Sequence, residues 1–141
     1  MKFMELNPHL TIIDPERADE IKQNAVRQNI PAYVISTGKR VGREAFFDAV
    51  RSALPMDPPL VSSRSWDALS DSLWEGIRSL GANRVAVLWP DSSFFSEEAP
   101  REFEIATSVL ADVAQSLADP KATRGRPVEL SIYIGRPSSS S

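Results

Sequence analysis

Cysteine is absent from the 141-residue chain, and histidine occurs once, at position 9. The first absence excludes disulfides and thiolate metal sites, and it is compatible with a reducing cytoplasm. A lone histidine close to a proline near a chain terminus is typical of a surface residue, so His9 is assigned no chemistry. We expect neither a metal nor a cofactor.

Long hydrophobic runs and a strong excess of one charge are missing as well. No segment has the length required to span a bilayer, and the first ten residues contain no apolar run. The formal net charge is only −3, which argues against direct binding of nucleic acid. We therefore expect a soluble, cytoplasmic protein that contacts neither a membrane nor nucleic acid.

Apolar runs alternate with amphipathic stretches through most of the chain. The periodicity and the bounding Gly and Pro residues predict strands near residues 32–36, 84–89 and 128–134, and helices near residues 42–54, 65–80 and 101–118. Strands that alternate with helices pair in parallel through right-handed crossovers. The predicted fold class is therefore α/β, with a small three-stranded parallel sheet packed with helices.

Both ends of the chain stand apart from this pattern. Residues 10–13 could form a short strand, and a helix is predicted to begin at Asp14, with only a thin apolar stripe. We therefore predict an N-terminal extension over residues 1–30, docked or mobile, before a domain at residues 31–136. The serine-rich tail, residues 137–141, is predicted to be disordered.

Three connecting segments carry residues that could contact a ligand or a partner. The polar loop after the second strand contains Phe94 and Phe95, which either fold back onto the core or form an exposed contact. Residues 120–127, PKATRGRP, are basic and resemble a mobile loop. Residues 36–40, STGKR, suggest a phosphate cradle, but they lack the spaced glycines of nucleotide-binding motifs, and a plain turn is favoured.

The stretch SRSWDALSDSLWEGIRSL, residues 63–80, is the most informative in the chain. Either Ser63 or Ser65 can cap the predicted helix. Its apolar residues recur at spacings of three and four and so share one buried face; they are Trp66, Leu69, Leu73, Ile77 and Leu80. Trp66 and Trp89 are predicted to lie in the core, and Trp74, at the border of the stripe, is predicted to be partly exposed.

The opposite face of this helix is acidic. Asp67 and Asp71 lie one turn apart and roughly 40° apart around the axis, and Glu75 continues the line with Arg78 beside it. The helix dipole favours an anion in the first turn, but Asp71 gains much less, and two aspartates at this spacing repel mildly. Two interpretations remain open: a solvated helix face, or an acidic surface for a cationic partner.

The order of elements from Pro31 to Gly135 resembles the barstar family of ribonuclease inhibitors. The sharpest match is WDALSDSL, residues 66–73, which follows the family pattern of an apolar residue, Asp-Ala-Leu, a variable residue, Asp, a variable residue and Leu. The resemblance implies that this helix and the loop before it plug the cationic active site of a ribonuclease. Asp71 then matches the aspartate that occupies the phosphate site of the enzyme, and Asp67 matches its neighbour. A carboxylate can imitate phosphate there by accepting charge-assisted hydrogen bonds.

Several positions depart from the family pattern. Residues 61–65, VSSRS, replace a loop that contains an aromatic residue, Gly and Asn, and Arg64 would present a like charge to a cationic enzyme. Ser70 replaces a large aromatic residue. Gln115, on the last helix, stands where the family has a contacting glutamate.

Together, these patterns predict a monomeric, bacterial-type immunity protein that binds and inhibits a basic ribonuclease or nuclease toxin. The predicted partner-binding residues are Ser63, Arg64, Asp67, Ser70, Asp71, Trp74, Glu75 and Gln115. The alternative is an interaction protein that keeps the barstar-like fold without inhibiting a ribonuclease, using the extension or the 120–127 loop. An enzyme is disfavoured, because no His, Cys or glycine-rich phosphate loop accompanies the paired carboxylates.

Overall fold

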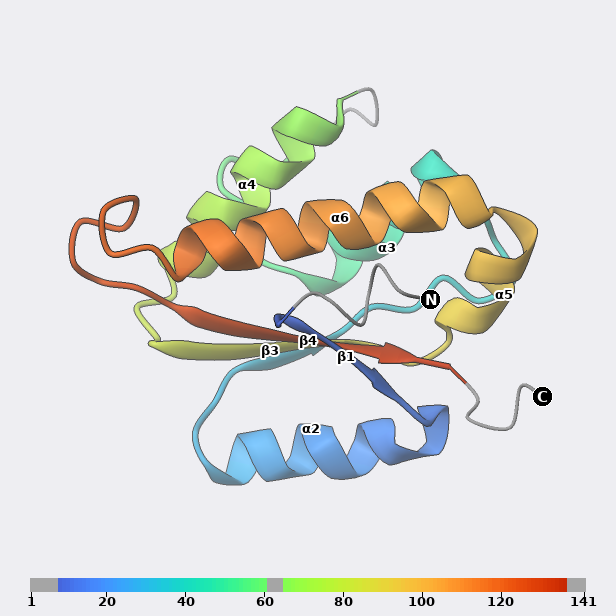
Figure 1. The fold of residues 1–141 in the computed structure, drawn as a ribbon, viewed down its shortest axis with the longest axis horizontal. Helices are drawn as coiled ribbons and strands as arrows, with labels where there is room; N and C mark the ends of the chain where they lie inside the picture. Colours follow the sequence, from blue (N-terminus) through green and yellow to red (C-terminus); the bar gives the residue numbers. More distant parts are fainter. Residues whose placement is uncertain (1–7, 61–64, 137–141) are drawn as a thin grey trace.

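The computed structural model describes residues 8–60 and 65–136 and has an α/β fold built on one parallel sheet (Figure 1). The strand order is β1–β4–β3–β2. The strands are β1 (Leu10–Ile13), β2 (Ala32–Val34), β3 (Arg84–Trp89) and β4 (Glu129–Gly135). The α/β class and the parallel pairing are confirmed, but the prediction of three strands is wrong, because the short run at residues 10–13 adds a fourth.

Helices cover both faces of the sheet (Figure 1). The helical segments are η1 (Pro15–Arg17), α2 (Ala18–Arg27), α3 (Arg43–Ala53), α4 (Trp66–Arg78), α5 (Ser92–Glu98) and α6 (Pro100–Leu117). Helices α3, α4 and α6 lie on one face, α2 lies on the other, and α5 sits near the carboxyl ends of the strands (Figure 1). Among the described residues, none of the helices is both long enough and apolar enough to cross a membrane.

Strand β1 is paired with the last strand of the chain. Its register on β4 runs from Leu10 opposite Ile132 to Ile13 opposite Gly135, and the N–H of Arg136 donates to the carbonyl of Ile13 at 2.8 Å. Leu10 is buried in the core under α3, α4 and α6, whereas Ile13 is buried on the α2 side. The strand therefore contributes to both hydrophobic clusters.

The larger cluster is centred on Trp89, whose side chain is fully buried. Its ring lies 5.1 Å from Phe46, 5.2 Å from Phe95 and 5.5 Å from Phe103, measured between centroids. The indole N–H donates to the hydroxyl of Thr37 at 3.2 Å, so its one polar group is satisfied. Trp66, predicted to be core, is half-buried against this cluster.

The smaller cluster lies under α2. Its buried members are Ile13, Ala18, Ala25, Ala86 and Leu88. Two alanines on the helix let its backbone approach the sheet closely, which is why a thin apolar stripe is enough to dock it.

The segment after β3 forms helix α5, where a polar loop was expected. Phe95 is fully buried and fixes the helix to the core, whereas Phe94 stays half-exposed with the ammonium group of Lys39 5.0 Å from its ring. Tertiary burial of one aromatic residue, which local periodicity cannot show, stabilises this seven-residue helix.

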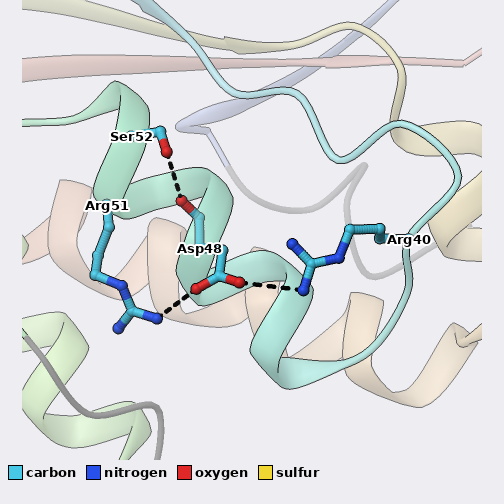
Figure 2. A network of polar contacts seen from close by, with 4 residues as sticks. All are labelled: Arg40, Asp48, Arg51 and Ser52. Atoms are coloured by element: carbon cyan, nitrogen blue, oxygen red, sulfur yellow. Dashed lines mark hydrogen bonds and ion pairs between the residues drawn. The ribbon is translucent and has the colours of Figure 1, made fainter.

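Hydrogen bonds and ion pairs hold the loop between β2 and α3 at both of its ends. The carboxylate of Asp91 accepts hydrogen bonds from the Ser36 hydroxyl at 2.7 Å and the Gly38 N–H at 3.0 Å. Because this carboxylate occupies the amides of the supposed phosphate cradle, the segment is a plain turn. At the far end, Asp48 binds Arg40 at 3.1 Å and Arg51 at 2.5 Å (Figure 2). The hydrogen bond from Arg51, and then that from Arg40, lower the pKa of Asp48.

Candidate partner-binding site

Helix α4 begins with a side-chain cap. The hydroxyl oxygen of Ser65 accepts a hydrogen bond from the N–H of Ala68 at 3.1 Å, which satisfies one of the unpaired amides of the first turn. Of the two expected caps, Ser65 is therefore the one observed. Ser63 and Arg64, both predicted to bind the partner, lie outside the described residues.

The back of α4 is packed tightly against the rest of the protein. Leu69, Leu73 and Ile77 are buried in the large core. The hydroxyl of Ser72 donates to the carbonyl of Pro58 at 3.0 Å. Leu80, predicted to continue the buried face, is 38% exposed because the helix ends at Arg78.

A glycine allows the connector before α4 to pass close to the helix. A Cβ atom at Gly76 would lie only 2.3 Å from the carbonyl oxygen of Pro55. This contact and the buried leucines fix the position of α4 on the core. The front face of α4 is therefore preorganised, and little conformational entropy of the helix would be lost when a partner binds it.

The front of α4 carries the two aspartates of the motif, and both are exposed. Asp71 lines a hollow of about 380 Å³ between α4 and α6. The lining residues are Ser70, Asp71, Trp74 and Glu75 from α4, and Asp112, Val113 and Ser116 from α6. The structure therefore brings four of the predicted site residues together, and a second helix completes the hollow.

Two of the predicted residues lie outside this hollow. Asp67 is exposed one turn before Asp71, on the same face of α4 but not among the lining residues. Gln115 is exposed on α6, and its helix neighbours Asp112 and Ser116 line the hollow in its place. Asp112 was missed, although its polar position opposite the apolar stripe of α6 was a usable signal.

Glu75 is held by an internal partner. Its carboxylate binds the Nη2 of Arg78 at 2.7 Å and the hydroxyl of Ser79 at 3.4 Å. The hydrogen bond from Arg78 is the main cause of the lowered pKa of Glu75. Among the described residues, Asp67, Asp71 and Asp112 form no salt bridge. Negative charge that no ion pair balances therefore lies at these three aspartates more than at Glu75.

Residues 31–133 match the family model described as Barstar (barnase inhibitor). The chain belongs to the barstar family. No individual curated protein and no solved structure matches the sequence significantly. The matched range contains α4 and α6, hence the whole hollow, whereas β1, η1 and α2 precede it. A strand and two helical segments therefore precede the part of the chain that the family model covers.

In this barstar-family chain, Trp74 forms the boundary between two neighbouring hollows. The side chain is half-buried, and the guanidinium carbon of Arg78 lies 5.6 Å from the centre of its ring. Its indole nitrogen is buried and finds no hydrogen-bond acceptor among the described residues. The second hollow, of about 330 Å³, lies on the other side, between Arg78 and the loop that contains Arg124.

The residues of this surface also bear on metal binding and catalysis. Among the described residues, no group of three or more His, Cys, Asp or Glu side chains could hold a metal ion. Asp71 and Asp112 lie beside serines and a tryptophan, with neither an imidazole nor a lysine lining the hollow. The arrangement gathers carboxylates at the surface between α4 and α6.

Proposed function

We propose that this protein inhibits a ribonuclease by inserting the acidic front of α4 into the cationic active site of the enzyme. The single observation that carries the proposal is Asp71. It is an exposed aspartate in the family motif, on a rigidly packed helix, at a hollow to which α6 adds Asp112. In this proposal Asp71 takes the position of a substrate phosphate and accepts hydrogen bonds from arginine, lysine or histidine.

Inhibition of this kind requires no chemical step in the inhibitor. The carboxylates of Asp67, Asp71 and Asp112 complement the positive potential that a ribonuclease uses to bind RNA, which steers association and raises its rate. The core behind α4 keeps the carboxylates in place, so binding occludes the active site without rearranging the inhibitor. The partner class is a basic ribonuclease or nuclease toxin.

The proposal is tested by capturing a nuclease from a lysate of the source organism and titrating its activity with the purified protein. Asp71→Ala is expected to weaken binding about 30-fold or more, the effect of losing about 2 kcal/mol at a desolvated hot spot. The matched control is Asp19→Ala, an exposed aspartate on α2, on the opposite side of the sheet (Figure 1). Equal inhibition by Asp71→Ala and the parent protein would refute this role.

Arg64 provides a second internal control. Against a cationic active site, Arg64→Ala is expected to leave inhibition unchanged or to strengthen it, because it removes a like charge. Weaker binding by this variant would indicate an acidic partner instead of a basic nuclease.

One observation favours a second function, an interaction protein that has kept the fold without inhibition. The residues before α4 lack the aromatic residue that the resemblance leads us to expect, and aromatic anchors usually dominate such interfaces. Capture of a protein without nuclease activity, through a contact that Asp71→Ala does not change, would support this alternative.

A further inference from the structure

Basic side chains gather where the C-terminal end of α4 meets the loop after α6. The exposed cations there are Arg78, Lys121, Arg124 and Arg126. Arg78 and Arg124 line the second hollow, together with Trp74, Glu75, Ala122 and Thr123. The sign of the surface charge therefore changes along α4, from the aspartates near its start to the arginine at its end.

The loop at residues 120–126 is folded as a series of hydrogen-bonded turns, although the sequence suggested a mobile segment. The N–H of Gly125 donates to the carbonyl of Pro120 at 2.7 Å, and the hydroxyl of Thr123 donates to the carbonyl of Asp119 at 2.8 Å. Thr123 is buried beneath the loop. These bonds hold the basic side chains on a defined backbone, which reduces the ordering entropy lost on binding.

Arg124 adopts a backbone conformation that arginine rarely takes. Its φ angle is 55°, in the left-handed region, where a residue with a Cβ atom is destabilised relative to glycine. Such residues concentrate at functional sites. Here the conformation belongs to a residue that lines the hollow.

The chemistry of the hollow suits carboxylates. A guanidinium group presents several N–H donors in a planar fork that matches a carboxylate. Two N–H groups of Arg78 are bonded to Glu75, and its guanidinium carbon lies 5.6 Å from the centre of the Trp74 ring. Arg124 adds a second guanidinium to the lining of the hollow.

We propose that Arg78 and Arg124, together with Lys121 and Arg126 of the same loop, form a basic contact surface that receives an acidic segment of the protein partner. The inference rests on the proposed function in taking the nuclease bound by the acidic front as the source of that segment. Because the two hollows share Trp74 and Glu75, one partner can cover both. Its binding face then carries carboxylates beside its cationic active site.

The neighbouring charges favour a protein segment over RNA. Glu75 lies within the basic hollow, and Asp71 and Asp112 flank it, so a chain of regularly spaced phosphates would meet repulsion on one side. Separate carboxylates on a folded protein can avoid these groups. The small net negative charge of the whole chain also argues against RNA as the ligand.

The test is an NMR titration of the ¹⁵N-labelled full-length protein with a capped peptide of four aspartates, at about 20 mM salt, where screening is weak. The expected result is saturable shifts of the Trp74 indole signal and of the amides of Arg78 and residues 121–126. Arg124→Gln is expected to weaken this binding about threefold or more, in line with the loss of one exposed ion pair. Arg101→Gln, which removes an exposed arginine at the other end of α6, is expected to leave it unchanged.

The variant Arg124→Gly distinguishes the effect of losing the charge from the effect of a folding defect. It removes the guanidinium while easing the left-handed backbone, so the protein is expected to stay folded and to bind the peptide as weakly as Arg124→Gln. Absence of saturable shifts, shifts spread over the other basic residues, or unchanged binding by these variants would each overturn the proposal. Tighter binding of a four-uridine oligonucleotide at the same signals would overturn the assignment to a protein segment.

A parallel titration with a peptide of four lysines tests the acidic front independently. Shifts at Asp67, Asp71 and Asp112 are expected from it. If the protein binds the aspartate peptide but not the lysine peptide, the role proposed for the acidic front is refuted, whereas the proposal of a basic surface is kept. The reverse result would refute the basic surface alone.

Discussion

Deletion of residues 1–28 removes β1, η1 and α2, the elements that precede the family match. In the intact protein β1 pairs with β4, and α2 covers the side of the sheet that faces away from α4 and α6 (Figure 1). The deletion therefore uncovers the α2 side of the sheet and removes the buried side chain of Leu10 from the larger core, but it removes no residue of the candidate site. We expect the remaining chain to fold cooperatively with reduced stability and to keep its affinity for the partner.

The expected loss can be estimated from the side chains that α2 covers. Leu88 is fully buried, and exposing such a side chain costs about 1.5–3 kcal/mol. Ala86 is 5% exposed, and Ala32 and Val34 are half-buried, so together they add about 1–2 kcal/mol at the same cost per area. The sum for the α2 side, about 3–5 kcal/mol, is smaller than the stability of many domains of this size, and the loss of the buried Leu10 adds to it.

The assay is urea denaturation of the full-length and truncated proteins, followed by tryptophan fluorescence. Two point variants separate the contributions within the full chain. Leu88→Ala is expected to destabilise by about 2–4 kcal/mol, whereas Val26→Ala, at a side chain that is 58% exposed on α2, should change stability by less than about 0.5 kcal/mol. An unchanged midpoint after truncation would refute the packing argument. A truncated protein without any transition would show that the extension and residues 31–136 form one folding unit.

Two further predictions concern α4. Gly76→Ala gains about 1 kcal/mol of helix propensity, but its Cβ would lie 2.3 Å from the carbonyl oxygen of Pro55. We therefore expect the free energy of unfolding, measured by urea denaturation, to fall by about 1–3 kcal/mol. The control Gln115→Ala, at an exposed position on α6, should not lower stability. Glu75→Gln removes a carboxylate whose pKa is lowered from 4.5 by Arg78. The folded state therefore binds fewer protons at Glu75 than the unfolded state does. The difference in stability between the parent protein and Glu75→Gln should be largest above about pH 4.5 and should shrink as the pH falls further. A difference that does not change with pH would contradict the role of the ion pair.

The strongest sequence signals were those that depend on local periodicity and caps. Leu69, Leu73 and Ile77 of the predicted α4 stripe are buried, one of the two candidate caps is observed, and the run ending in Trp89 is buried. These features arise from contacts within one or two turns, or from a strand buried on both faces. The parallel arrangement also followed from the alternation of elements.

What the sequence did not predict depends on contacts between distant segments. The sequence suggested a short strand at residues 10–13, but not its pairing with β4, more than a hundred residues later in the chain. The short helix α5 depends on burial of Phe95, and the order of the 120–126 loop depends on bonds to Asp119 and on burial of Thr123. Local patterns contain no information about such partners.

The candidate site was half predicted for the same reason. The sequence identified Asp67 and Asp71 because both lie on one helix within one motif. Asp112 belongs to a different helix, and only the packing of α6 against α4 brings it to the hollow beside Asp71. Conversely, Glu75 looked like a third member of the acidic line, but it is bound to Arg78.

The Glu75–Arg78 pair also bears on how the protein would choose a partner. Glu75 lines both hollows whereas Arg78 lines only the basic one, so the sign of the surface charge changes at this pair. A partner that is uniformly basic would gain at the aspartates and be repelled at Arg124, Lys121 and Arg126. Since specificity is a difference between affinities, the basic region would select among nucleases that share a cationic active site. The altered residues before α4 and the basic loop after α6 would then act together, and the cognate enzyme would differ from other ribonucleases in the acidic groups around its active site.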